Sequence, residues 1–271
     1  MATAIHPKNE FPANSLRKGT GLLAWVRRVT STAVGAKQLM ALTGLALTLF
    51  VIGHLAGNLK LYAGQDSINA YAEFLKSTGP LLWVARGGLL AVFVLHLSLA
   101  IWLKYRSKLA RPVPYAYAST VQASYASRTM LLTGLAVGSF VLFHLAHYTL
   151  GVAVGAQVTG ISETVNYLDL TDAQGRHDVY SMAVYGFQNE VISAAYILAM
   201  CVLFFHLLHG VKSAFQSLGL NTPRWERFWN GAAWAVALFV VVGNISIPAM
   251  ILAGEIQPNP DLSNTLKAIG Q

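Results

Sequence analysis

Apolar residues along this chain gather into five long stretches separated by polar connections. A run of roughly 20 apolar residues matches the hydrocarbon core of a bilayer, which is about 30 Å thick. The pattern therefore predicts an all-α integral membrane protein with five transmembrane helices. The five stretches cover about residues 38–57, 82–103, 129–150, 190–211 and 231–254.

The stretches divide the chain into three predicted parts. We expect a cytoplasmic N-terminal segment over residues 1–37, a five-helix transmembrane domain over 38–254 and an extracytoplasmic tail over 255–271. The first 20 residues contain prolines and cations but no apolar core, so a cleaved signal peptide is not expected.

Composition agrees with a membrane protein. The chain is 55% hydrophobic and only 11% charged, whereas soluble domains carry roughly 25% charged residues. Its formal charge of +8 lies in short segments beside the apolar stretches, which is typical of membrane orientation and not of nucleic-acid binding. A single cysteine excludes disulfides and Cys-ligated clusters within the chain.

Charge differs sharply between alternate connections. Residues 1–37 hold six cations against one acid, and residues 104–128 hold five cations and no acid. The positive-inside rule therefore predicts a multi-pass protein of the bacterial inner membrane, with the N-terminus in the cytoplasm. The long connection 151–189 is the acidic one, with Arg176 alone against Glu163, Asp169, Asp172 and Asp178.

Two outer connections carry further structural signals. Residues 66–77 place Ile68, Tyr71 and Phe74 at helical spacing, which predicts an amphipathic helix on the outer face. The 39-residue segment 151–189 is long for a bare loop, so we expect it to pack over the bundle or over a site.

Six of the eight histidines lie within apolar stretches, and four consecutive stretches each carry at least one. A lone histidine in a membrane helix is often a helix–helix hydrogen-bonding residue. Four in succession are harder to explain in this way, because polar groups there are costly and usually functional. The six are His54, His96, His144, His147, His206 and His209.

The depths of these histidines fall into two pairs. His54 and His144 come late in stretches that run outward, and His96 and His206 come late in stretches that run inward. At 1.5 Å of rise per residue the two levels differ by roughly 10–15 Å. This spacing predicts that the first four helices form a bundle around two stacked haems b, each with one imidazole on either side.

Other uses of the histidines fit the pattern less well. Zinc and copper sites need three or four converging ligands, whereas a porphyrin supplies four nitrogens and needs only two more. A proton relay usually includes carboxylates, and none lies deep in the five stretches.

Several nearby residues are weaker candidates for haem contacts. His147 and His209 each follow a proposed ligand by three residues, so each either replaces its neighbour, hydrogen-bonds a haem propionate or forms an interhelical hydrogen bond. Gly57 lies on the His54 face and leaves room for a ring edge. Arg128 and Lys212 are within reach of inner-haem propionates, although interfacial anchoring explains both equally well.

The motifs around these histidines carry a family resemblance. Over about residues 30–254 the chain resembles the diheme cytochrome b anchor subunit of succinate dehydrogenase and fumarate reductase, in its single-polypeptide form. The carrying segments are TSTAVGAKQLMALTG (30–44), FVIGHLAGNL (50–59), FVLHLSLAIWLK (93–104), FVLFHLAHY (140–148), LFFHLLHGVKSAF (203–215) and NTPRW (221–225).

The resemblance implies a set of ligands. His54 and His144 would bind the outer haem iron and His96 and His206 the inner one, in preference to His147 and His209. Some fumarate-reducing members carry a glutamate two residues before the fourth-helix histidine, linked to transmembrane proton movement. Here that position is Phe204, which favours a succinate-oxidising enzyme.

The resemblance also implies partners. A flavoprotein subunit with FAD and an iron–sulfur subunit would dock on the cytoplasmic face, and electrons would pass through the haems to menaquinone or ubiquinone in the membrane. The chain would do no succinate chemistry itself. If quinone meets the outer haem, the candidates near that face are Asn58, Lys60, Glu73 and Tyr148, although Glu73 is equally well explained as a solvated residue.

Two other functions remain as alternatives. One is the cytochrome b anchor of another quinone-linked enzyme, such as a hydrogenase or formate dehydrogenase. The other is a haem-free channel or transporter, for which interrupted helices would be typical. Pro248 is the only proline inside an apolar stretch, so the pattern gives this second alternative little support.

Overall fold

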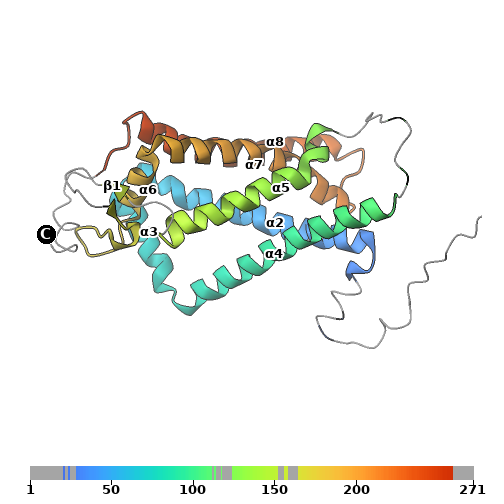
Figure 1. Cartoon of the computed structure of the whole chain (residues 1–271), viewed down its shortest axis with the longest axis horizontal. Coiled ribbons are helices and arrows are strands. Elements are labelled where there is room, and N and C mark those ends of the chain that lie inside the picture. Colours follow the sequence, from blue (N-terminus) through green and yellow to red (C-terminus); the bar gives the residue numbers. More distant parts are fainter. Residues whose placement is uncertain are drawn as a thin grey trace, which may run out of the picture.

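Five long helices dominate the computed structural model and run along its longest axis (Figure 1). The structure describes residues 29–111, 124–151 and 164–258, with residues 21, 24, 113, 117, 156 and 157 in addition. Most of the predicted N-terminal segment and tail therefore lies outside the described residues. The long helices are α2 (Ala33–Asn58), α4 (Pro80–Leu109), α5 (Tyr125–His144), α7 (Glu190–Ser217) and α8 (Glu226–Leu252).

Each of these helices is long and apolar enough to cross a membrane, which confirms the five predicted spans. Most extend beyond the apolar stretches, because the backbone stays helical where the side chains turn polar. The last two turns of α4, for example, carry Lys104 and Lys108, whose long side chains can reach water from a helix end. Thr32 and Ser124 cap the starts of α2 and α5 by accepting from Gly35 N and Ser127 N.

Short elements gather at one end of the bundle, on the left in Figure 1, which we call the cap end. The helices α2 and α5 continue towards it through the 3₁₀ turn η2 (Leu59–Ala63) and the π-turn η3 (Leu145–Thr149). The predicted amphipathic helix is confirmed as α3. The other short elements are α3 (Gln65–Ser77), η4 (Tyr167–Asp169), α6 (Val179–Gln188) and the antiparallel pair β1 (Ala156–Gln157) and β2 (Thr164–Val165).

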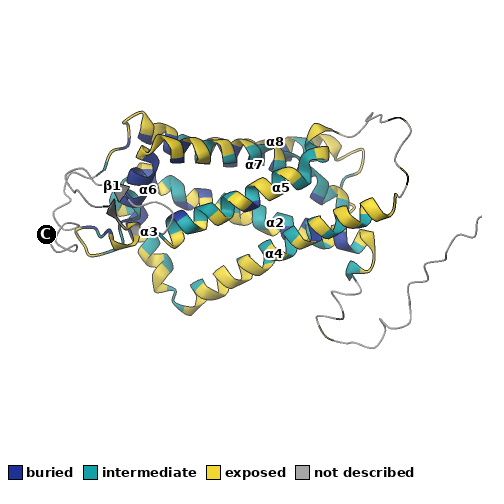
Figure 2. Cartoon of the chain, viewed as in Figure 1, coloured by how far each residue is buried: buried dark blue, intermediate teal, exposed yellow. Residues whose placement is uncertain are grey.

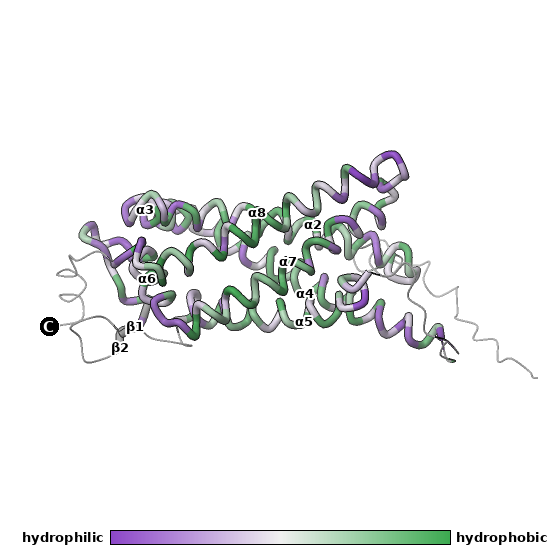
Figure 3. Tube along the Cα trace, turned by 90° about the horizontal axis from the view of Figure 1, so that it is seen from above, coloured by the Kyte–Doolittle hydropathy of each residue, from purple (hydrophilic) through white to green (hydrophobic). Residues whose placement is uncertain are grey.

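The opposite end, where α2, α5 and α8 begin, carries many of the cations, and we call it the basic end. Colouring by hydropathy shows apolar helix centres between polar ends (Figure 3). Many large apolar side chains on the outside of the bundle are exposed, including Leu81, Trp83 and Val84 of α4. This distribution is that of a multi-pass membrane protein, whose exposed apolar surface faces lipid.

Helix α7 lies at the centre of the packing. It contacts α8 most extensively and also contacts α2 and α5, whereas α4 packs mainly on α2. Figure 2 shows the same asymmetry, since α4 is largely exposed along its length. One cluster of buried apolar side chains joins Met200, Leu203 and Leu207 of α7 to Ala237 and Val240 of α8.

A buried polar cluster holds the cap together. Asn69 of α3 is 0% exposed, and its Nδ2 donates to Asp172 Oδ2 at 3.1 Å and to Asp178 Oδ1 at 3.0 Å. Gln65 adds a donor to Asp178 Oδ2 at 2.7 Å. These bonds join α3 to the start of α6 across more than 100 residues, so the described residues 164–189 of the long acidic segment pack over the end of the bundle.

Arg176 completes this cap cluster. Its guanidinium donates to Asp172 at 2.8 Å and to Asp66 at 2.8 Å. Burial alone would raise the pKa of Asp172, but hydrogen bonds from Asn69 and Arg176 and the charge of Arg176 bring that pKa below its usual value. His177 is half-buried, and its Nδ1 donates to Leu170 O at 3.2 Å.

Candidate histidine centre

The histidines of the four helices α2, α4, α5 and α7 lie at two levels. His96 of α4 packs against Gly44 of α2, and His206 of α7 packs against Gly134 of α5. His54 follows Gly44 by ten residues on α2, and His144 follows Gly134 by ten residues on α5. That interval corresponds to about 15 Å along a helix axis, so His54 and its partner on α5 lie one level nearer the cap end.

His96 is held at the lower level, towards the basic end, by polar groups of α2. Its Nδ1 lies 3.1 Å from Thr43 Oγ1 and 3.2 Å from Met40 O. The neighbouring Gly44 lets the imidazole approach the helix closely, because a Cβ at this position would lie 3.0 Å from His96 Cε1.

His206 is held at the same level in the same way. Its Nδ1 lies 3.3 Å from Thr133 Oγ1 of α5, and a Cβ at Gly134 would lie 3.2 Å from its Cε1. Because His54 and His144 lie side by side and each follows its glycine by ten residues, Gly44 and Gly134, with the histidines that face them, lie at one depth. The two imidazoles thus approach one region of the bundle from α4 and α7.

At the upper level the two imidazoles are nearly perpendicular. The ring centroids of His54 and His144 lie 5.8 Å apart, with an angle of 80° between the ring planes. Two imidazoles on opposite sides of one metal ion, with metal–nitrogen bonds of about 2 Å, have centroids about 6 Å apart. Phe50 stacks on His54, and Phe140 packs against His144, so apolar rings flank the pair.

Tyr196 of α7 connects the two histidines of α5, a role that the sequence did not suggest. Its hydroxyl lies 3.3 Å from His144 Nδ1 and 3.0 Å from His147 Nδ1. One signal could have found it. Tyr196 precedes His206 by ten residues, the same interval that separates the two levels on α2 and α5.

His147 sits in the π-turn η3 and is 0% exposed. Its ring lies 4.0 Å from that of Tyr148 and 5.6 Å from that of Phe143, measured between centroids. Single π-turns within α-helices occur often at functional sites. Both His144 and His147 therefore point at Tyr196, and which of them is the ligand stays a prediction from the family resemblance.

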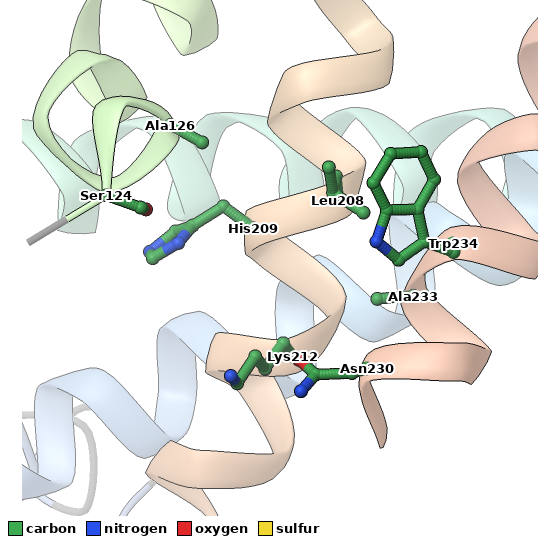
Figure 4. A pocket seen from close by; sticks show the side chains of 8 residues that line it. All are labelled: Ser124, Ala126, Leu208, His209, Lys212, Asn230, Ala233 and Trp234. Atoms are coloured by element: carbon green, nitrogen blue, oxygen red, sulfur yellow. The ribbon is translucent and has the colours of Figure 1, made fainter. Parts of the chain in front are cut away.

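A cavity of about 230 Å³ opens beside the lower level, between α5, α7 and α8 (Figure 4). His209 and Lys212 of α7 line it, which brings two of the predicted propionate contacts to one place. Lys212 also forms an ion pair with Glu226 at 3.2 Å. The remaining lining residues are Ser124, Ala126, Leu208, Asn230, Ala233 and Trp234.

The other predicted contacts are more scattered. Arg128 is close in sequence to Ser124 and Ala126, which line this cavity. Its side chain is exposed, and its guanidinium lies 5.9 Å from the ring of Tyr125. The space beside Gly57 is filled by Tyr71 of α3, because a Cβ there would lie 2.7 Å from that ring. The glycines that face histidine rings are instead Gly44 and Gly134.

The four quinone candidates all lie towards the cap end, on the four elements α2, η2, α3 and η3. Asn58 ends α2, and Lys60 lies 5.5 Å from the ring of Tyr71. Glu73 is exposed on α3. Tyr148 packs against Phe187 of α6, with ring centroids 5.7 Å apart.

The arrangement suits a porphyrin better than a bare ion. Among the described residues, no three or more His, Cys, Asp or Glu side chains converge as a metal site. At the lower level the contacts to both histidines use Nδ1, and a ligating histidine commonly engages one ring nitrogen in this way while the other binds metal. The residues present therefore fit two bis-histidine haems.

Comparisons with known proteins give no relative for this chain. No protein-family model matches it, and neither the curated proteins nor the solved structures include a match.

Proposed function

We propose that this chain is a diheme cytochrome b, the membrane anchor of a succinate:quinone oxidoreductase. One observation carries the haem part of the proposal. Four histidines from four membrane helices form two pairs about 15 Å apart along the bundle, and the lower pair is held by Nδ1 contacts to neighbouring helices. The succinate part rests on the resemblance of the histidine motifs.

The residues of the chain would hold, orient and insulate the two groups. His54 and His144 would ligate the haem nearer the cap end, and His96 and His206 the haem nearer the basic end. Each bound haem supplies a one-electron carrier. Phe50 and Phe140 flank the upper pair and keep water from it, which fixes the polarity around the ligands.

The cavity beside the lower level offers a place for haem propionates. His209, Lys212 and Asn230 bring hydrogen-bond donors to its wall, and Lys212 brings a positive charge. These groups lie on the side of the bundle that carries the basic connections. His209, Lys212 and Asn230 would therefore hold the propionates of a haem bound at the lower level.

The two ends of the bundle would serve different partners. By the positive-inside rule the basic end faces the cytoplasm of a bacterium, where the iron–sulfur subunit and the FAD-containing flavoprotein subunit would dock. Quinone would react near the cap end, among Asn58, Lys60 and Tyr148. Glu73, which is exposed there, would exchange a quinone proton with water.

A pyridine haemochrome assay with histidine variants tests this function. Wild-type protein should yield two haems b per chain, and His54→Ala and His96→Ala should each lose one, from different levels. His6→Ala is the matched control, because His6 lies outside all five apolar stretches. No haem in a well-folded preparation would overturn the proposal in favour of a haem-free transporter.

A second measurement separates the succinate enzyme from other quinone-linked enzymes. With its partner subunits assembled, addition of succinate should reduce both haems in the visible spectrum. If two haems are bound but succinate leaves them oxidised, the chain is still a diheme cytochrome but is not the anchor of a succinate-oxidising enzyme.

A further inference from the structure

Two copies of the tripeptide Leu-Thr-Gly occupy matching places in the bundle. They are residues 42–44 of α2 and 132–134 of α5. The glycine of each copy precedes an upper-level histidine of its own helix by ten residues. Each also faces a lower-level histidine on a different helix, Thr43 with His96 and Thr133 with His206. The two sides of the lower site are therefore built alike.

The hydroxyl protons of the two threonines are already committed to their own helices. Thr43 Oγ1 lies 2.9 Å from Met40 O and 3.0 Å from Leu39 O, and Thr133 Oγ1 lies 3.1 Å from Met130 O. A hydroxyl has one proton to donate, and a carbonyl oxygen can only accept. Each threonine oxygen can consequently meet an imidazole only as an acceptor.

The carbonyl of Met40 fixes the tautomer of His96, and the Thr133 contact favours the same tautomer in His206. The Nδ1 of His96 faces Thr43 Oγ1 and Met40 O, so it must carry the proton. The Nδ1 of His206 faces Thr133 Oγ1, and it carries the proton when the Thr133 hydroxyl donates to Met130 O, as it does at 3.1 Å in this structure. The lone pair of each ring is then on Nε2, the atom that would bind iron.

We propose that Thr43 and Thr133 are positioning residues for the lower haem, which set the tautomer and the orientation of both axial imidazoles. This inference rests on the proposed function and deepens it. An acceptor for Nδ1–H makes the imidazole a stronger donor to the metal, which favours the ferric state. With haem bound, the threonines would therefore lower its midpoint potential, and Gly44 and Gly134 allow the close approach of the imidazoles that these contacts require.

The two threonines do not contribute equally. Among the hydrogen bonds of the described residues, Nδ1 of His96 has two acceptors, Thr43 Oγ1 and Met40 O, whereas Nδ1 of His206 has Thr133 Oγ1 alone. Removing Thr133 Oγ1 should thus affect the lower haem more than removing Thr43 Oγ1.

Valine and serine replacements in the haem-loaded protein test the proposal. Thr133→Val keeps the shape and removes the acceptor, and Thr133→Ser restores the acceptor. Thr129→Val is the matched control on the same helix, because among the described residues the Thr129 hydroxyl donates to Tyr125 O and Ala126 O and has no hydrogen bond to a histidine. Haem content, redox titration in visible light and low-temperature electron paramagnetic resonance are measured for each.

Thr133→Val should still bind two haems, raise the midpoint potential of one and change its resonance signal, while the other haem stays as in wild type. Thr43→Val should shift the same haem by less, and Thr133→Ser and Thr129→Val should match wild type. Unchanged potentials and signals in Thr133→Val and Thr43→Val would overturn the positioning role while leaving the diheme function intact. Absence of haem from wild type would overturn the function itself. Should Thr133→Val not accumulate, Thr133→Ala, which also removes the acceptor, decides by the same criterion.

Discussion

Tyr196 is the residue that links His144 and His147 near the upper level. Its one hydroxyl contacts Nδ1 of both His144 and His147, so a change at this atom affects two imidazoles at once. Removing one partner of a buried hydrogen bond costs about 1–3 kcal/mol when the other partner is left unsatisfied. The lower level has no such shared group among the described residues, because Thr43 and Thr133 each serve a single histidine.

We predict that Tyr196→Phe alters the upper haem selectively. The protein should retain two haems, but the potential and the resonance signal of the haem at His54 and His144 should change, and those of the lower haem should not. Redox titration and electron paramagnetic resonance measure both. Tyr180→Phe is the control, because the Tyr180 hydroxyl donates to Gln257 O in the cap. An equal change in both haems would argue against a local role for Tyr196.

At the scale of elements, the cap is a polar structure laid over an apolar bundle. Asn69 joins α3 to the start of α6 by donating to two buried carboxylates, Asp172 and Asp178. The pKa of Asp172 is below its usual value in the folded cap. A lowered pKa means that this carboxylate stabilises the fold above its unfolded pKa of about 4, and that the contribution is lost as the pH falls through the folded value.

We therefore predict that acid loosens the cap before it disturbs the membrane helices. Hydrogen exchange followed by mass spectrometry should show faster exchange in α3 and α6 as the pH falls below about 4, after correction for the intrinsic rate. Asp172→Asn should loosen the cap at neutral pH and flatten its response to acid. Cap exchange that ignores pH in wild type would contradict the prediction.

The elements also mark how far the sequence alone could lead. The five spans and α3 were predictable, because hydropathy and helical spacing are local signals. The contacts of Thr43, Thr133 and Tyr196 were not, since a hydroxyl in an apolar helix usually bonds its own backbone. The link between Asn69 and Asp178 spans 109 residues, and only the folded chain brings the two together. For the histidine pairs only the depth was predictable, because the alternating directions of successive helices set how deep each histidine lies in the membrane.

For the whole molecule, the separation of charge predicts where soluble partners bind. Lys104 and Lys108 are exposed at the end of α4 on the basic end, while the cap end presents Asp66 and Glu73. Charged groups on a docking surface speed association, and salt screens their attraction over roughly 10 Å at 0.1 M. A partner that binds the basic end should therefore associate more slowly as ionic strength rises.

We predict that the double variant Lys104→Gln, Lys108→Gln slows assembly with the iron–sulfur and flavoprotein subunits and weakens its salt dependence. The measurement is the association rate of the soluble subunits with detergent-solubilised anchor at several salt concentrations. Lys76→Gln provides the control, because Lys76 is equally exposed but lies on α3 at the cap end. If Lys76→Gln slows assembly as much as the double variant, the partners bind the opposite end, and the orientation inferred from charge must be reversed. An effect confined to α4 instead places the lower haem, with His96 and His206, nearest the electron donor.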